Sequence, residues 1–74
     1  MDDRAFLTKM EELLECSPGS LSLEQELRQT GKWDSLNFMS FLAMAHSEYG
    51  VRVAPADLNA CKTIGDAMKL VAKQ

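Results

Sequence analysis

The sequence predicts an all-α fold, and three observations lead to that fold class. Apolar residues recur at helical spacing in three stretches, which begin near Asp3, Ser35 and Thr63. The short alternating stretch at residues 51–53 has no second strand with which it could pair. A chain of 74 residues is long enough for one domain, so residues 1–74 are expected to form a single small bundle of four helices, the third of them short.

The first helix is expected over residues 3–15. Its apolar residues fall on one helical face, at positions i, i+1, i+4, i+7 and i+8: Phe6, Leu7, Met10, Leu13 and Leu14. Asp2 and Asp3 stand at its start, where negative charge complements the helix dipole. Pro18 and Gly19 stop it, because neither residue continues a helix.

Residues 21–33 carry a weaker pattern. Leu21, Leu23 and Leu27 can anchor a loop, which could include a helical turn over residues 23–27 before Gly31 interrupts it. A linker this long inside so small a domain is usually packed or functional, and its three leucines favour a packed one.

The second helix is expected to run from Ser35 to about Tyr49, where Gly50 ends it. With about 100° of rotation per residue, one side gathers the residues that we assign to the core: Phe38, Phe41, Leu42, Ala45 and Tyr49. A second apolar side presents Leu36, Met39 and Ala43. Because so short a chain cannot easily enclose a helix on all sides, we expect Leu36, Met39 and Ala43 to form a surface for partner proteins.

Two more helices complete the bundle. Pro55 suits the first position of a short helix that reaches about Ala60. The last helix is expected to begin at Thr63, whose hydroxyl can cap it, with Asp66 three residues later as in a capping box. Its inward face consists of Ile64, Ala67, Met68 and Val71.

Charge and composition exclude several classes of protein. Eight basic residues stand against eleven acidic ones, whereas a nucleic-acid-binding protein needs a positive surface facing phosphates. No stretch approaches the roughly 18 apolar residues of a membrane span, and the first residues do not form a signal peptide. Cys16 and Cys61 have neither metal-site nor disulfide-framework spacing and are expected to be reduced. We therefore expect a cytoplasmic monomer without nucleic-acid or membrane partners.

The residues needed for an enzyme do not come together in this sequence. His46 is the single histidine, which excludes a histidine metal cluster and leaves a catalytic triad one candidate base. We expect it to be solvated or to face a partner. The carboxylates of the first half are expected on exposed surfaces: Asp2, Asp3, Glu11, Glu12, Glu15, Glu24 and Glu26. The expectation is a non-catalytic protein with no metal site of its own.

One chemical handle remains at Ser35. It follows Asp34 at the expected start of the second helix, among backbone N–H groups that have no intrahelical partner. The plainer interpretation of this pair is a helix cap. The alternative is that the Ser35 hydroxyl carries a phosphate-linked group, which the helix dipole would stabilise by about 0.3–1 kcal/mol. No neighbour in sequence activates the hydroxyl, so another enzyme would have to attach the group.

The sequence resembles the acyl carrier protein family along most of its length. The motifs that carry the resemblance occur in order: Asp34-Ser35-Leu36, Glu48-Tyr49-Gly50-Val51, Val53-x-Pro55 with Asp57-Leu58, and Thr63-Ile64-Gly65-Asp66. The resemblance implies a four-helix bundle of the acyl-carrier type. It also implies that a phosphopantetheinyl transferase attaches 4′-phosphopantetheine to Ser35, with Asp34 helping to bind magnesium in the transferase complex. The thiol of this arm would then carry acyl or aminoacyl groups as thioesters between loading and acyl-transferring enzymes.

The second helix departs from the carriers of fatty acid synthases, which usually line it with acidic residues. Here Glu48 is its one acidic residue, and much of the surface consists of Asn37, Ser40, His46 and Ser47. Fatty acid biosynthesis and a specialised acyl or aminoacyl pathway are therefore both possible interpretations. The position of Trp33 before the motif resembles that of D-alanyl and similar secondary carriers. A rival function needs no modification: a helical interaction module that binds partners through Leu36, Met39 and Ala43.

Overall fold

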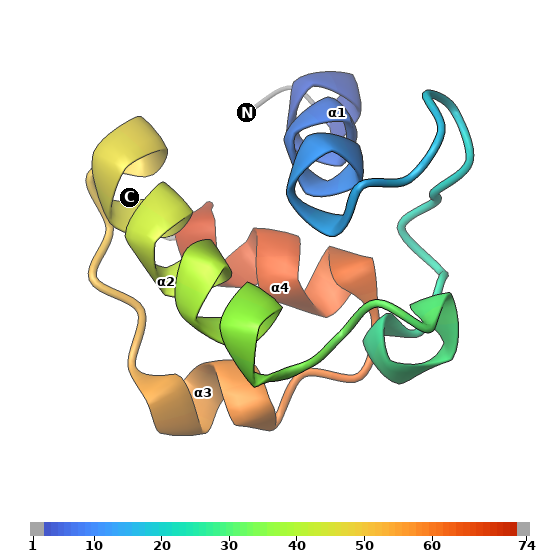
Figure 1. Cartoon of the computed structure of the whole chain (residues 1–74). Coiled ribbons are helices and arrows are strands. Elements are labelled where there is room, and N and C mark those ends of the chain that lie inside the picture. The colour runs from blue at the N-terminus through green and yellow to red at the C-terminus, as the bar shows by residue number, and fades with distance from the viewer. Residues whose placement is uncertain (1–2, 73–74) are drawn as a thin grey trace.

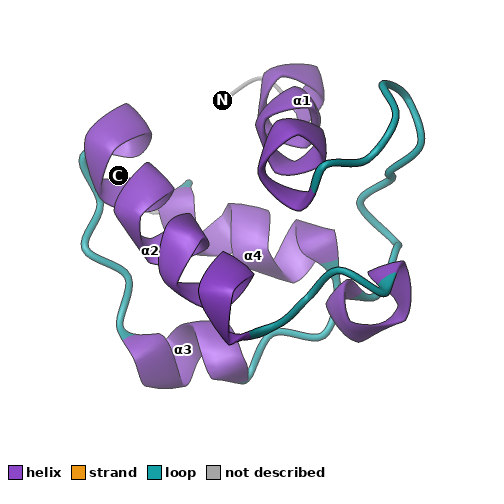
Figure 2. Cartoon of the chain, viewed as in Figure 1, coloured by secondary structure: helices purple, strands orange, loops and turns teal. Residues whose placement is uncertain are grey.

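The computed structural model describes residues 3–72. Within them it contains four α-helices and one 3₁₀ helix, in the order α1 (Asp3–Leu14), η1 (Leu27–Thr30), α2 (Ser35–Tyr49), α3 (Pro55–Asn59) and α4 (Ile64–Val71). Figure 2 shows helices and connecting loops, with no strand among the described residues. The predicted all-α bundle with a short third helix is confirmed.

The helices surround a common apolar centre. α1 packs against α2, and α3 packs against α4. In Figure 1 the long connection between α1 and α2 closes one side of the bundle, and the connector between α2 and α3 closes the other. The buried apolar residues come from the four α-helices, η1 and the loop between α3 and α4: Phe6, Met10, Leu14, Leu27, Phe41, Ala45, Leu58, Cys61, Ile64, Ala67 and Val71.

An aromatic contact joins the first two α-helices at the centre of the core. The rings of Phe6 and Phe41 meet edge to face with their centroids 6.3 Å apart, and Tyr49 lies 6.2 Å from Phe6. Such a pair stabilises a fold by about 0.5–1.5 kcal/mol beyond the burial of its area. The core side that was predicted for residues 35–49 is therefore correct, since Phe41 and Ala45 are fully buried and Phe38, Leu42 and Tyr49 pack against them.

The end of α2 and the start of α4 follow local signals. Gly50 adopts a φ of 68° and donates its N–H to the carbonyl of His46, which is the 5→1 hydrogen bond of an αL C-cap, and the Val51 N–H donates to the Ala45 carbonyl. At α4, Thr63 Oγ1 accepts from the Asp66 N–H and Asp66 Oδ2 accepts from the Thr63 N–H, each at 3.1 Å. The predicted capping box is confirmed. Because the backbone N–H groups of Thr63 and Lys62 donate to Asp66, the pKa of its carboxyl lies below its ordinary value.

The first helix ends slightly earlier than expected. Glu15 has a left-handed φ of 58°, and Cys16 donates its N–H back to the Glu11 carbonyl at 2.8 Å. The chain therefore leaves the helix at Leu14, before it reaches Pro18 and Gly19.

The helical turn considered for residues 23–27 lies instead at Leu27–Thr30. Residues 23–27 form backbone hydrogen bonds with the segment that leads into α4: Leu27 N–H to Lys62 O at 3.0 Å, Ile64 N–H to Gln25 O at 2.9 Å, and Gly65 N–H to Leu23 O at 2.8 Å. A Cβ on Gly65 would lie 3.1 Å from the Leu23 carbonyl oxygen, so a side chain at this position would push the two segments apart by a few tenths of an ångström.

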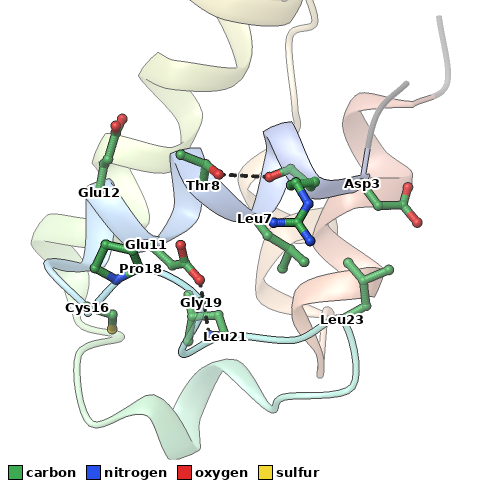
Figure 3. A pocket seen from close by; sticks show the side chains of 11 residues that line it. Asp3, Leu7, Thr8, Glu11, Glu12, Cys16, Pro18, Gly19, Leu21 and Leu23 are labelled. Carbon is green, nitrogen blue, oxygen red and sulfur yellow. Dashed lines mark hydrogen bonds between the residues drawn. The ribbon is translucent and has the colours of Figure 1, made fainter.

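Glu11 corrects the expectation that the acidic residues lie on exposed surfaces. It is only 6% exposed, and its Oε2 accepts a hydrogen bond from the Leu21 N–H at 3.2 Å. Figure 3 shows this contact between α1 and the loop that follows it. The loop folds back against α1, and its backbone N–H needs an acceptor there. Glu26 is half-buried; Asp3, Glu12, Glu15 and Glu24 are exposed as expected, and Asp2 lies outside the described residues.

None of the described helices is long and apolar enough to span a bilayer. Both cysteines are free thiols, with Cys16 half-buried and Cys61 buried.

Candidate functional site

The candidate site is the start of α2. Asp34 is the N-cap: its Oδ1 accepts a hydrogen bond from the Asn37 N–H at 2.9 Å, and its carbonyl accepts from the Phe38 N–H at 2.8 Å. Ser35 is the first residue of the helix and is exposed. Its hydroxyl makes no hydrogen bond to any residue in 3–72. The cap therefore falls on Asp34 alone, and the Ser35 hydroxyl stays available for chemistry.

A series of hydrogen bonds fixes the backbone that leads to Ser35. Thr30 Oγ1 donates to the Leu27 carbonyl at 2.7 Å and accepts from the Lys32 N–H at 3.1 Å. Asn37 Nδ2 then donates to the Lys32 carbonyl at 2.7 Å. These contacts connect η1 to the first turn of α2, so the serine stands on an ordered segment.

Trp33 fastens the same segment to the core. Its ring lies 6.0 Å from the ring of Phe38 and 6.4 Å from that of Phe41. From the sequence Trp33 is only a point of resemblance, and its structural role was not predicted. Large aromatic residues at positions i, i+5 and i+8 around a helix start could have indicated it.

A surface hollow of about 340 Å³ lies beside Ser35. It is lined by residues of η1, the following loop, α2 and α3: Arg28, Trp33, Asp34, Ser35, Phe38, Met39 and Asn59. The volume is at the low end of the roughly 300–1,000 Å³ that is typical of ligand pockets. An exposed hydroxyl at the edge of such a hollow fits a covalently attached group. Arg28 on η1 and Asn59 on α3 were not among the predicted site residues, because both lie outside the motif around Ser35.

The predicted apolar surface is present on α2. Leu36 is 72% exposed and Met39 is 62% exposed, and Ala43 is also exposed. Leu36 and Met39 are large apolar side chains that the described fold leaves in solvent, next to Ser35. Their position on the surface is confirmed, and their role in partner binding stays a prediction.

The one acidic side chain of α2 is already paired. Glu48 Oε1 lies 2.9 Å from Lys9 Nζ on α1. The hydrogen bond to Glu48 raises the pKa of the Lys9 ammonium above its ordinary value, because it stabilises the charged form. The exposed face of α2 therefore offers a basic partner very little free negative charge.

The remaining reactive residues do not combine into a second site. His46 is exposed near the end of α2. Burial raises the pKa of the Cys61 thiol, which is opposite to the shift that makes a cysteine nucleophilic. Across residues 3–72 no group of three or more His, Cys, Asp or Glu residues could hold a metal ion.

A family model described as a phosphopantetheine attachment site matches residues 4–71. The matched range extends from the first turn of α1 to the end of α4 and contains the hollow and Ser35. Neither a curated protein nor a solved structure matches the chain significantly.

Proposed function

The chain belongs to the family of carrier domains with a phosphopantetheine attachment site, and from this we propose that Ser35 carries the 4′-phosphopantetheine. Members of this family interact with modifying and acyl-handling enzymes and are generally non-catalytic. One observation supports Ser35 as the attachment residue most directly. Asp34 caps α2, while the neighbouring Ser35 hydroxyl is exposed and makes no hydrogen bond within the described residues.

The attachment is a phosphoryl-group transfer to Ser35. The Ser35 Oγ forms a bond to the coenzyme A phosphorus that bears pantetheine, and the pyrophosphate P–O bond at that phosphorus breaks. Adenosine 3′,5′-bisphosphate leaves, and a base of the transferase takes the hydroxyl proton. The resulting phosphodiester lies at the N-terminus of α2, where the helix dipole favours an anion by about 0.3–1 kcal/mol.

Asp34 supports this reaction in the proposal. Its Oδ1 is occupied by the Asn37 N–H, whereas its Oδ2 makes no hydrogen bond to residues 3–72. A carboxylate oxygen is a suitable ligand for magnesium, which binds oxygen donors and keeps several waters. Oδ2 is therefore free to contact the magnesium ion of the transferase complex without loss of the helix cap.

The arm supplies a terminal thiol that holds a cargo as a thioester. We propose that the cargo is an acyl or aminoacyl group, which the carrier moves between loading and accepting enzymes in fatty acid synthesis or in a specialised acyl pathway. In this proposal the carrier is a monomeric single domain in the cytoplasm. The specialised pathway is favoured, because Glu48 is paired with Lys9 and α2 has no other acidic residue for basic partners to bind.

Leu36, Met39 and Ala43 form the proposed partner surface, since they are exposed beside the attachment residue. The same surface supports the second candidate, an unmodified helical interaction module. Intact mass after incubation with a phosphopantetheinyl transferase, magnesium and coenzyme A separates the two. The carrier should gain the mass of one phosphopantetheine, whereas an unchanged mass with several transferases would favour the interaction module.

A further inference from the structure

The hollow beside Ser35 contains one cation, Arg28. Of the residues that line it, Arg28 is the only basic one and Asp34 the only acidic one. Arg28 is exposed, and within residues 3–72 its side chain makes no ion pair and no hydrogen bond. A guanidinium beside the candidate attachment residue is thus available to an anion from outside the fold.

The backbone under Arg28 is held in place. The neighbouring Leu27 is 1% exposed, and its N–H donates to the Lys62 carbonyl at 3.0 Å. On the other side, Gly31 ends η1 with a φ of 74°, and Thr30 Oγ1 donates to the Leu27 carbonyl. η1 therefore presents Arg28 from a fixed backbone position, so that only its side chain has to be ordered when it binds an anion.

Modification of Ser35 changes the charge of this hollow. The formal charges of Arg28 and Asp34 cancel before modification. A phosphodiester on Ser35 adds a second anion in the residue next to Asp34, and like charges at such short range repel. Arginine is suited to this position, because its planar fork can donate two parallel hydrogen bonds to phosphate oxygens.

The rest of the lining suits the part of the arm next to the phosphate. That part carries two methyl groups on one carbon, followed by a hydroxyl and the first amide. Trp33, Phe38 and Met39 give the hollow an apolar wall, and Asn59 contributes an amide that can both donate and accept hydrogen bonds.

We propose that this hollow holds the phosphate end of the arm in the modified protein. Arg28 binds the phosphodiester, and the methyl groups of the arm contact Trp33 and Phe38. The proposal rests on the function proposed above and adds a residue that positions the arm from outside α2. It implies that the arm leaves Ser35 in a preferred direction, toward η1 and α3, instead of sampling all directions equally.

Trp33 is a built-in reporter for this arrangement, because it is the single tryptophan of the chain and lines the hollow. The experiment compares acrylamide quenching of its fluorescence before and after complete modification, verified by intact mass. Wild type is measured beside Arg28→Gln, Arg28→Lys and Lys32→Gln. Lys32→Gln is the matched control, since it removes one exposed positive charge close to Ser35 in sequence but outside the lining of the hollow.

Modification should reduce quenching of Trp33 in wild type and in Lys32→Gln, and Arg28→Gln should lose this reduction. Arg28→Lys should keep part of it, because lysine retains the charge without the fork. Circular dichroism should be unchanged in every variant, since both residues are exposed. Two results would overturn the role of Arg28: a decrease in quenching on modification of Arg28→Gln that is as large as in wild type, or a Lys32→Gln variant that loses this decrease to the same extent as Arg28→Gln. Unchanged quenching in fully modified wild type would overturn the role of the hollow. If wild type gains no mass at all, the proposed function itself fails, and the two failures are thereby distinguished.

Discussion

Asp34 Oδ1 accepts the Asn37 N–H at 2.9 Å, and this contact separates two roles that the sequence leaves merged. An Asp-Ser pair at a helix start can supply a cap, a reactive hydroxyl, or both. In the structure Asp34 caps α2, so the hydroxyl of Ser35 is not used to hold the helix together. Substitutions at Asp34 can therefore separate its effect on the stability of the fold from its effect on the modification of Ser35.

Asp34→Asn and Asp34→Ala should differ in their free energy of unfolding but should both slow the labelling of Ser35. Asparagine keeps an acceptor for the Asn37 N–H, so the free energy of unfolding should change by less than about 0.5 kcal/mol, whereas alanine should lower it by about 1 kcal/mol. Both should slow labelling of Ser35, because neither side chain offers magnesium a charged ligand. Urea unfolding and the labelling rate measure the two effects. Labelling of Asp34→Asn at the wild-type rate would restrict Asp34 to its capping role.

Glu11 should contribute to stability through its hydrogen bond to the Leu21 N–H. Glu11→Ala leaves a partly buried donor without its acceptor and should lower the free energy of unfolding by about 1–3 kcal/mol. Glu11→Gln keeps an acceptor oxygen and should cost less. Glu12→Ala is the control, because Glu12 is exposed on the same helix and should change stability by no more than about 0.5 kcal/mol. Equal urea midpoints for Glu11→Ala and Glu12→Ala would contradict the structural role of Glu11.

Met39→Asp should impair recognition without unfolding the domain. Met39 is 62% exposed, and disrupting a central apolar anchor of an interface typically costs more than about 1–2 kcal/mol, so labelling of Ser35 should slow by about ten-fold. Ser47→Asp places the same charge on an exposed site of α2 and should label normally. Glu48→Gln should have a small, salt-sensitive effect. Thermal unfolding and the labelling rate are measured for each variant. Loss of the folded state in Met39→Asp would place Met39 in the core. A larger labelling defect in Glu48→Gln than in Met39→Asp would show that recognition is electrostatic.

Asp66 should make the domain sensitive to acid. Its pKa is lowered from the ordinary value of 3.8, so the charged form is favoured in the folded state. Its stabilising effect is therefore fully present above that ordinary value and is lost as pH falls through the lowered pKa. Asp66→Asn should flatten the dependence of unfolding free energy on pH between about pH 5 and about pH 2.

The control for this prediction is Asp57→Asn, which removes an exposed carboxyl in the first turn of α3. It should leave the acid-side loss of stability largely in place. Equal pH curves for wild type and Asp66→Asn, measured by urea unfolding, would show that the capping box does not couple to pH.

The helices could be predicted because their signals are local. The core side of α2 follows from rotation along one helix, and Gly50 and the Thr63–Asp66 pair mark their boundaries within a few residues. The exposed positions of Leu36 and Met39 follow from the same periodicity together with the short length of the chain.

The parts that could not be predicted depend on contacts between distant segments. The pairing of residues 23–27 with residues 62–65 needs the close approach of Gly65 to the Leu23 carbonyl, and an isolated glycine in a helical motif does not reveal its neighbour. Burial of Glu11 depends on the path of the loop beside it. The hollow combines Arg28 from η1 with Asn59 from α3, and no spacing along the chain indicates that pair.

The most direct measurement is the intact mass of wild type, Ser35→Ala and Ser47→Ala after incubation with a phosphopantetheinyl transferase, magnesium and coenzyme A. Ser47 is an exposed serine on the same helix, so its variant controls for the loss of a hydroxyl on α2. Wild type and Ser47→Ala should each gain the mass of one phosphopantetheine, and Ser35→Ala should gain none while keeping its helical circular dichroism spectrum. Mass gain in folded Ser35→Ala would contradict the assignment of Ser35 as the attachment residue.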